Sequence, residues 1–598
     1  MKYTAPENLV TDFVSRGFVA LAPDSLGVPN DTHERIYALA KQARLDKNRI
    51  TASLIPEVLS VINAPAVVDV CQKLVGKDWA IVASSHNAAF LSGAHDQHWH
   101  KDDNGPYNLR KARHHHAIQI EMLYYPQTVK EDMGPTAVMP YSQYWAFNHE
   151  ENHDNFAGAD HLDFQYHIGG MDRTPVSGPN SEYDPEDIRL RKTAHDKRMR
   201  EALEQTGWPL ASQFEVGPLQ AGSVILVSHN LFHRGNHRRD DWQTWQDNQR
   251  FMWRFWLYRT TEPDADDAND VNWRDLAVDP MTGIELSEAV PVTEALWRHH
   301  NHWIQTGRPP PKTEGSAESL KDRLHARGEA AEPTRIAAAY ELATVDDEEN
   351  AISVLAEGLR AERESVRRAA TYGLVALGDA ATSTFLSAIT SPVRWVRKAG
   401  AFGLGAAGAP TLEVVSALRE RLEKDESVYV RSVTVDAIGC LVRRLAARGQ
   451  DESIKVCCDV LIDSLDREEN RLAMNVAQNR SIKFVRPTDD CDVCEGIGVD
   501  YNEERFEPVR SAVRESALWS LVILTTHYKN LDDRAVHMLE SIVREDTNVF
   551  AVGLAMDALN RADRISEETL QWSPIADWES LSRCERTISA PKPSPKTS

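Results

Sequence analysis

The segment QHWHKDD at residues 97–103 carries the clearest chemical pattern in the chain. It places His100 and Asp102 two positions apart, and on a β-strand positions i and i+2 project from the same face. An imidazole and a carboxylate at this spacing can converge on one metal ion. A His-x-Asp pair is a weak signal alone, because it arises often by chance.

A third ligand is available in the later segment AGSVILVSHNLFHRG, residues 221–235, where an apolar run that reads as a strand ends at His233. Two histidines and one carboxylate form a facial ligand set for non-haem iron, which leaves positions open for a chelating cosubstrate and O2. We therefore expect His100, Asp102 and His233 to be the metal ligands and the catalytic centre.

An arginine suited to the cosubstrate follows the third ligand. Arg250 opens the apolar run FMWRFWLYR, and its planar guanidinium can bind the distal carboxylate of 2-oxoglutarate in a bidentate manner. Arg254 lies four residues further along the same strand and points the same way. It is the second candidate for cosubstrate binding.

Two other histidines allow different ligand sets. His98 shares a strand face with His100, so a zinc site of His98, His100 and His233 is conceivable, but it would leave Asp102 and Arg250 without a role. His229 lies four residues before His233 and is an alternative distal ligand.

Candidate substrate contacts lie near the His-x-Asp strand. Asn104 and Tyr107 follow it, where the mouth of a site is expected. Residues 114–116 are three consecutive histidines, and on a strand only His114 and His116 would point into a barrel together. A solvated or hydrogen-bonded surface role is the alternative for these histidines.

The elements that position these residues are expected to be strands. Residues 1–305 contain short apolar, β-branched and aromatic runs separated by Gly, Pro, Asn and Asp. An amphipathic helix in ENLVTDFVSRG precedes the strand GFVALAP, and the later strand candidates are AIVASSHNAAFL, HAIQIEMLYYP, GSVILVSHNLF and FMWRFWLYR. Long helices do not alternate with them, which favours an all-β barrel or jelly roll. The polar insertion 149–213 is a candidate lid.

The second half of the chain has a helical repeat. Val-Arg pairs at 366, 396, 430 and 513 are each followed by small residues and then Leu or Ile, and the first two gaps of 30 and 34 suit a two-helix unit. We expect a HEAT-like α-solenoid over 336–575, in which these stripes are core packing. The Pro-rich stretch 306–335 is the expected linker, and 576–598 the expected disordered tail.

The bulk composition limits partners and location. The formal charge of -23, from 90 acidic and 67 basic side chains, disfavours nucleic acid and anionic membranes as partners. No secretory signal or run of about 18 apolar residues is present, and the seven scattered cysteines fit a reducing, cytoplasmic location. Cys491 and Cys494 form a lone CxxC, for which an ordinary structural role outweighs a metal or redox role.

Several of these motifs together resemble the phytanoyl-CoA dioxygenase family, a branch of the Fe(II)/2-oxoglutarate oxygenases built on a double-stranded β-helix. The resemblance covers roughly residues 8–260 and rests on GFVAL, QHWHKD, the YYPQ...MGPTAVMPYSQ segment at 124–143, AGSVILVSHNLFHRG and the strand after Arg250. It implies iron ligation by His100, Asp102 and His233, with Arg250 on the cosubstrate carboxylate. The interval from His233 to Arg250 is longer than the family pattern, which keeps Arg254 open.

The function expected from this resemblance is hydroxylation of a C–H bond in a small-molecule or carrier-bound substrate. Fe(II), 2-oxoglutarate and O2 would be consumed or bound, with ascorbate as an optional reductant, and succinate and CO2 released. Asp102, in place of a small residue, favours hydroxylation over halogenation. The alternatives are an inactive oxygenase-like scaffold whose HEAT-like solenoid mediates protein interactions, and an enzyme that uses the solenoid to dock a protein partner. The sequence does not identify the substrate.

Overall fold

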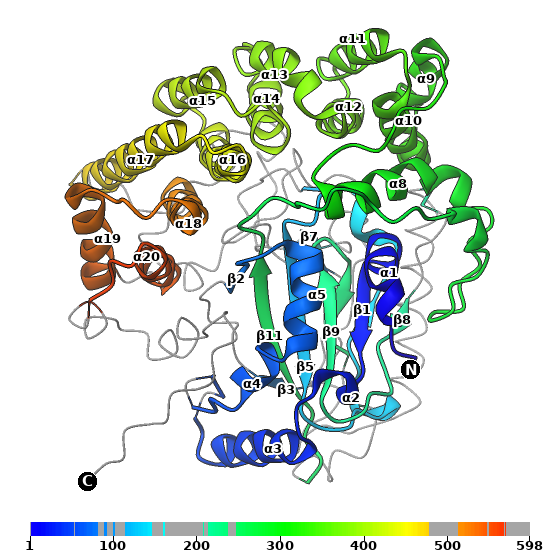
Figure 1. The fold of residues 1–598 in the computed structure, drawn as a ribbon, viewed down its shortest axis with the longest axis vertical. Helices are drawn as coiled ribbons and strands as arrows, with labels where there is room; N and C mark the ends of the chain where they lie inside the picture. Colours follow the sequence, from blue (N-terminus) through cyan, green and yellow to red (C-terminus); the bar gives the residue numbers. More distant parts are fainter. Residues whose placement is uncertain are drawn as a thin grey trace.

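The computed structural model describes residues 2–48, 50–52, 54–81, 89–91, 100–101, 114–145, 160–161, 207–208, 213–236, 238, 247–477, 512–546, 549–566 and 569 of the chain. It has an N-terminal region of antiparallel sheets and a C-terminal region of helices, which form an arc around one end and one side of the sheets (Figure 1). Several predicted features lie outside the described residues: His98, Asp102, Asn104, Tyr107, most of the insertion 149–213, Cys491, Cys494 and the tail 576–598.

The strands form two sheets in which all pairs are antiparallel. The first has the order β1-β9-β5-β11-β2, with β3 also pairing with β11, and the second has the order β7-β4-β10-β6-β8. The apolar runs expected as strands supply β1, β5, β9 and β11, the longest strands of the first sheet. The strands are β1 Phe18–Leu21, β2 Ala80–Ile81, β3 Ala89–Leu91, β4 His100–Lys101, β5 Gln119–Tyr125, β6 Ala137–Val138, β7 Asp160–His161, β8 Phe214–Glu215, β9 Ser223–Ser228, β10 His233–Arg234 and β11 Phe251–Tyr258.

A separate apolar cluster joins residues of the two sheets. Leu123 and Tyr125 of β5 and Ile225 and Val227 of β9 pack there with Val138 of β6. Because side chains alternate along a strand, the neighbouring residues of β5 and β9 face the opposite side and enter a second, larger core. The first sheet is therefore buried on both faces, which explains why its strands are almost continuously apolar.

Helices cover the face of the first sheet that enters the larger core, and α5 lies in front of this sheet in Figure 1 and contacts β5. The apolar spacing of α5 buries Val67, Val70, Cys71 and Leu74 on one side. The helices of this region are α1 Leu9–Arg16, α2 Pro23–Leu26, α3 Asn30–Leu45, α4 Val58–Ile62 and α5 Pro65–Val75.

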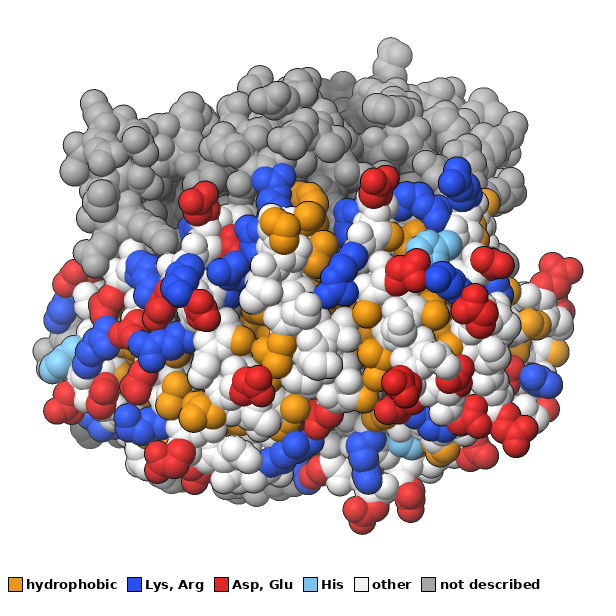
Figure 2. All heavy atoms as spheres, turned by 90° about the horizontal axis from the view of Figure 1, so that it is seen from above, with side chains coloured by type: hydrophobic (Ala, Val, Ile, Leu, Met, Phe, Trp, Pro, Cys, Tyr) orange, Lys and Arg blue, Asp and Glu red, His pale blue; other side chains and the backbone are white. Residues whose placement is uncertain are grey.

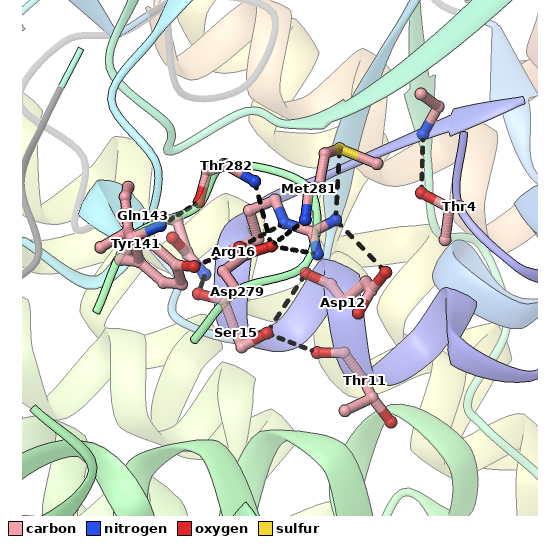
Figure 3. Close-up of polar contacts among 12 residues, drawn as sticks. Thr4, Thr11, Asp12, Ser15, Arg16, Tyr141, Gln143, Asp279, Met281 and Thr282 are labelled. Atoms are coloured by element: carbon pink, nitrogen blue, oxygen red, sulfur yellow. Dashed lines mark hydrogen bonds and ion pairs between the residues drawn. The ribbon is translucent and has the colours of Figure 1, made fainter. Parts of the chain in front are cut away.

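A buried polar network anchors α1 (Figure 3). Arg16 donates from Nε and Nη2 to the two carboxylate oxygens of Asp279, at 2.7 and 2.9 Å. The Tyr141 hydroxyl donates to the same carboxylate, and Arg16 also pairs with Asp12 one turn earlier at 3.2 Å. Burial alone would raise the pKa of Asp279, but the hydrogen bond and charge of Arg16 outweigh it and the pKa is lowered.

The C-terminal region consists of helices in two rows. The even-numbered helices from α10 to α20 pack on one another in order, and the odd-numbered helices from α11 to α19 lie outside them, each beside its even-numbered partner. The helices are α8 Val290–Thr306, α9 Ala317–Leu324, α10 Glu332–Thr344, α11 Glu348–Gly358, α12 Glu364–Leu377, α13 Thr382–Ala388, α14 Arg394–Ala406, α15 Leu412–Lys424, α16 Val428–Ala447, α17 Asp451–Ala477, α18 Ala512–His527, α19 Asp533–Glu545 and α20 Val549–Arg561.

The Val-Arg repeat is core packing, as predicted. Each valine lies at the start of an inner helix and is buried; these are Val366, Val396, Val430 and Val513. Arg367 and Arg431 turn back and donate to carbonyl oxygens of the loop before their own helix. Arg397 pairs with Asp425 at 2.7 Å, in the loop before the next inner helix. The repeat therefore fixes both the loop and the next helix pair.

Small residues allow the inner helices to approach closely. A Cβ added to Gly405 of α14 would lie 2.4 Å from Cα of Ala437 in α16, a distance that atoms cannot occupy. Glycine at this position lets the two helix backbones pack against each other.

The two regions share one apolar core, which extends from Leu9 of α1 to Ala562 after α20. The stretch 306–335, expected to be a linker, contains α9, whose Ala317, Leu320 and Leu324 are buried in this core. Their spacing of three and four residues makes an apolar helical stripe within a segment whose Pro and Ser content favours an open spacer.

Polar contacts also cross between the regions. Arg443 of α16 pairs with Glu262, which follows β11, at 2.9 Å, and His527 of α18 hydrogen-bonds the Thr260 carbonyl oxygen at 2.7 Å. Arg561 of α20 donates to the Asp78 carbonyl oxygen at 3.1 Å. The inner row of helices therefore rests against the sheet region at several points.

The face of the helical region seen in Figure 2 has mixed charge, with hydrophobic side chains between groups of Lys, Arg, Asp and Glu. Ion pairs also join neighbouring helices at the surface, as between Arg534 of α19 and Asp463 of α17 at 2.8 Å. No helix in the described ranges combines the length and the apolar character needed to cross a lipid bilayer.

Candidate functional site

Two of the three predicted metal ligands are direct neighbours across a β-ladder. β10 pairs antiparallel with β4, and His233 is the register partner of His100. On its other side β10 pairs with β6, where His233 is opposite Val138. Directly opposed residues have the shortest cross-strand separation in an antiparallel pair. The fold thus brings together two positions that are 133 residues apart in the chain.

His233 is held in a defined orientation. Its side chain is 8% exposed, and its Nδ1 lies 3.1 Å from the carbonyl oxygen of Leu231. A carbonyl oxygen only accepts, so Nδ1 is the donor in this contact, and in the neutral ring the lone pair is then on Nε2. This is the tautomer that metal-binding histidines adopt when a backbone carbonyl orients them.

The segment 139–145 supports the strand that carries His233. The Met139 amide donates to the Phe232 carbonyl oxygen at 2.8 Å, and the Phe232 amide donates to Oγ of Ser142 at 3.0 Å. Gln143 and Tyr144 in turn donate to the Val14 carbonyl oxygen of α1, at 2.8 and 2.9 Å. The network around Arg16 is therefore connected through this segment to the histidine strand.

Arg250 is a buried cation with unused hydrogen-bonding capacity. It immediately precedes β11 and is 3% exposed, and within the described part of the chain its Nε and Nη1 have no hydrogen-bond acceptor. Burial lowers its pKa, while the Tyr125 phenol acts in the opposite direction. Gln127 fixes the next residue by hydrogen-bonding both the amide and the carbonyl of Phe251, at 3.0 and 3.1 Å. A buried guanidinium with two nitrogens that lack acceptors is suited to bind an anion.

The Tyr125 side chain connects Arg250 to the histidine strands. The Tyr125 hydroxyl lies 2.9 Å from Oγ1 of Thr136, the residue before β6. The charge of Arg250 acts on the Tyr125 phenol, and Val138 of β6 is the ladder partner of His233, so Tyr125 lies between Arg250 and the second sheet.

Arg254 has different surroundings from Arg250. It lies within β11 opposite Leu123, and its guanidinium stands over the Trp256 ring, 5.4 Å from the centroid. A cation over an aromatic face is already stabilised without a ligand. Of the two candidate arginines, Arg250 has the greater need for an anionic partner.

A buried polar group in the first sheet went unnoticed in the sequence. Glu121 of β5 accepts a hydrogen bond from Nε1 of Trp256 at 2.8 Å and lies 3.5 Å from Nδ1 of His229. His229, the alternative distal ligand, thus lies beside a carboxylate of the first sheet, whereas His233 belongs to the second. The alternation Glu121-Leu123-Tyr125 on one strand face is the signal that could have identified Glu121 as inward-facing.

The prediction that His114 and His116 point together from a strand is wrong. The strand begins only at Gln119, and residues 114–116 form an irregular segment that contacts helices. His114 lies against Phe402 of α14, with ring centroids 4.6 Å apart, and His116 stacks on Trp303 of α8 at 3.7 Å. The positions of these histidines are determined by packing against helices that are distant in the sequence, which a local pattern cannot predict.

Comparisons with known proteins give similar solved structures but no family. No family model matches the sequence, and no curated protein matches it. The solved structures similar to this chain include SnoK, a non-heme α-ketoglutarate-dependent carbocyclase from nogalamycin biosynthesis, at 14% identity over 43% of this chain and 85% of SnoK, with a TM-score of 0.28. Iron-bound HygX from Streptomyces hygroscopicus has 12% identity over 43% and 87%, with a TM-score of 0.28. AviO1 from Streptomyces viridochromogenes Tue57 has 11% identity over 43% and 96%, with a TM-score of 0.25.

Proposed function

We propose that the sheet region is a Fe(II)- and 2-oxoglutarate-dependent dioxygenase of the double-stranded β-helix type that hydroxylates a C–H bond of its substrate. His100, Asp102 and His233 would hold the iron, and Arg250 would bind the distal carboxylate of 2-oxoglutarate.

The observation that carries this proposal is the direct ladder pairing of His100 with His233. Two ligands to one metal must be neighbours in space, and the ladder makes these two positions neighbours although the intervening chain contains most of the sheet region. Asp102 follows His100 by two residues, the spacing that returns a strand to the same face.

The donor set suits the proposed groups. The His233 tautomer presents Nε2, and imidazole with carboxylate is the ligand combination of non-haem Fe(II) sites. Arg250 supplies a buried guanidinium whose Nε and Nη1 have no acceptor among the described residues, as a site for a carboxylate requires. When bound, Fe(II), 2-oxoglutarate and O2 would supply the oxidising chemistry, with succinate and CO2 as products.

The protein's own residues would orient the groups that bind the metal and the cosubstrate, and would shield the centre from water. The Leu231 carbonyl fixes the His233 ring, and Gln127 fixes the start of β11 and hence the position of Arg250. The apolar cluster between the sheets, with Leu123 and Val138, would exclude water from the centre.

We further propose that the helical region is a HEAT-like solenoid that holds the catalytic region. Its paired helices repeat the Val-Arg motif, and its inner row contacts the sheet region through Arg443, His527 and Arg561. These contacts support a role as a structural cradle.

The experiment that tests the function measures succinate formation and 2-oxoglutarate binding. Purified full-length protein is loaded anaerobically with Fe(II), and we expect it to bind 2-oxoglutarate and, on exposure to O2, to release succinate slowly even without the true substrate. A screen of metabolite extracts for faster succinate release would then point to the substrate.

The test variant is His233→Ala, and its matched control is His229→Ala. We expect His233→Ala to lose iron, and His229→Ala to keep it, because His229 lies beside Glu121 in the other sheet. Wild-type protein that binds neither iron nor 2-oxoglutarate would contradict the proposal and favour an inactive scaffold.

A further inference from the structure

A second group of histidines gathers where the sheet region meets the helices. His116 precedes β5, and His299 and His300 are consecutive residues of α8, the helix between the sheets and α10 in Figure 1. The three side chains are 5%, 1% and 3% exposed, and one ring nitrogen of each lies within 4.8 Å of the others. This cluster has no part in the proposed iron centre.

The spacing of two of these nitrogens is that of ligands sharing a metal. Nε2 of His116 and Nε2 of His299 are 3.1 Å apart. Two imidazole nitrogens on one tetrahedral zinc, each about 2.0–2.1 Å from the ion, are separated by about 3.3 Å. The His116 ring is held in place by stacking on Trp303, with centroids 3.7 Å apart.

Hydrogen bonds within the described residues leave one ring nitrogen of the cluster without a partner. Nδ1 of His299 is buried and has no hydrogen-bond partner in the described residues. If the contact between His116 and His299 is a hydrogen bond, His299 still has one unused nitrogen in either tautomer. Buried polar atoms without partners are uncommon and call for an additional group.

A hydrogen bond holds the ring of the third histidine. The Tyr340 hydroxyl lies 2.9 Å from Nε2 of His300 and 2.9 Å from Nδ1 of His115, and a hydroxyl can donate to one nitrogen and accept from the other. A hydrogen bond to one nitrogen of an imidazole fixes the ring and directs the other nitrogen toward an ion.

Burial affects the ionisation of all three histidines of the cluster. Burial, together with the neighbouring histidines, lowers the pKa of His116 and of His300 well below its ordinary value, and burial lowers that of His299 to about 3.

We propose that His116, His299 and His300 form a second metal site, which binds Zn(II) and joins the sheet region to α8. Three imidazole ligands without a carboxylate suit zinc and disfavour Mg²⁺ and Ca²⁺, which prefer oxygen. A cavity of about 20 Å³ lined by His115, Tyr144 and His300 adjoins the third histidine and is large enough for one water, which is the proposed fourth ligand.

The test measures metal in full-length protein with the His233→Ala substitution, which removes the proposed iron ligand. After dialysis against Zn(II) and then metal-free buffer, this protein should retain about one equivalent of zinc per chain. Adding His116→Gln or His299→Gln should remove that equivalent, whereas His302→Gln, on the same helix but outside the cluster, should not.

A second measurement needs no substitution in the cluster. Cobalt(II) added to the His233→Ala protein should give the intense visible absorption of a tetrahedral site, and zinc should abolish it. Zinc content that is unaffected by His116→Gln and His299→Gln, or no retained zinc and no cobalt spectrum, would overturn the proposal and leave a hydrogen-bonded histidine core. Neither result depends on 2-oxoglutarate, so this test is independent of the proposed oxygenase function.

Discussion

Replacing Arg250 by methionine should separate ligand binding from stability. The guanidinium has two buried nitrogens without an acceptor among the described residues, and a carboxylate could accept a hydrogen bond from each. Charge-assisted hydrogen bonds contribute about 1.5–3 kcal/mol each, so their loss should cost about 3–6 kcal/mol of binding free energy. Since about 1.4 kcal/mol is a factor of ten, the Kd for 2-oxoglutarate should rise roughly 10²- to 10⁴-fold.

The same substitution should not destabilise the protein without ligands. Burial of the Arg250 charge is unfavourable, and it lowers the pKa of the group. Replacing a buried charged group by an apolar side chain of similar volume is often neutral or stabilising, by about 1–4 kcal/mol. We therefore expect the free energy of unfolding of ligand-free Arg250→Met, measured in urea, to equal or exceed that of the wild type.

The two assays are calorimetric titration of 2-oxoglutarate into Fe(II)-loaded protein under anaerobic conditions and urea unfolding of the metal-free protein. Arg254→Met is the matched control, because Arg254 already lies over the Trp256 ring. Unchanged 2-oxoglutarate affinity together with lower stability in Arg250→Met would refute the reasoning, since Arg250 would then be a structural group. A loss of affinity confined to Arg254→Met would assign the carboxylate to Arg254 instead.

Three further substitutions test the packing that supports the site. Arg16→Met should lower the free energy of unfolding by about 3–5 kcal/mol at pH 7, because Asp279 would remain a buried anion, and an added Asp279→Leu should restore most of the loss in urea unfolding. In the wild type, Arg16 lowers the pKa of Asp279. The ion pair therefore stabilises the folded protein above the ordinary pKa range of a carboxyl group, and this stabilisation is lost as the pH falls through the lowered pKa. The difference in free energy of unfolding between wild type and Arg16→Met should accordingly shrink in acid. Glu262→Met should cost about 3–5 kcal/mol by leaving Arg443 buried without its carboxylate, a loss that Arg443→Met added to it should reduce. Gly405→Val should destabilise by about 1–3 kcal/mol or more through overpacking against Ala437, read as a lower Tm.

Much of the fold was predictable because its signals are local. The strands β5, β9 and β11 are long apolar runs with β-branched and aromatic residues, and the Val-Arg repeat marks the inner helices α12, α14, α16 and α18. The helix α9 was missed, because the prolines and serine around it favour a spacer and its short apolar stripe becomes significant only when it packs against the shared core.

The polar groups were less predictable, since their partners are distant in sequence. Asp279 is 263 residues from Arg16, and no pattern near either residue indicates the other. The histidine cluster likewise requires the segment before β5 to meet α8, so the run of histidines at 114–116 offered only the alternation of a strand that does not form there. The proximity of the ladder partners His100 and His233 could be predicted, unlike that of the other polar groups. Both are residues that can bind one metal ion, and such ligands must lie close together.

The common apolar core of the sheet and helical regions has a consequence for how the molecule comes apart. Since the larger apolar cluster runs continuously from Leu9 to Ala562, no plane of weak contact divides the residues that the structure describes into halves that could open separately. Unfolding of the helical arc would expose apolar groups of the sheet region to water at the same moment. Loss of the helices and loss of the proposed iron centre should therefore occur as one cooperative event.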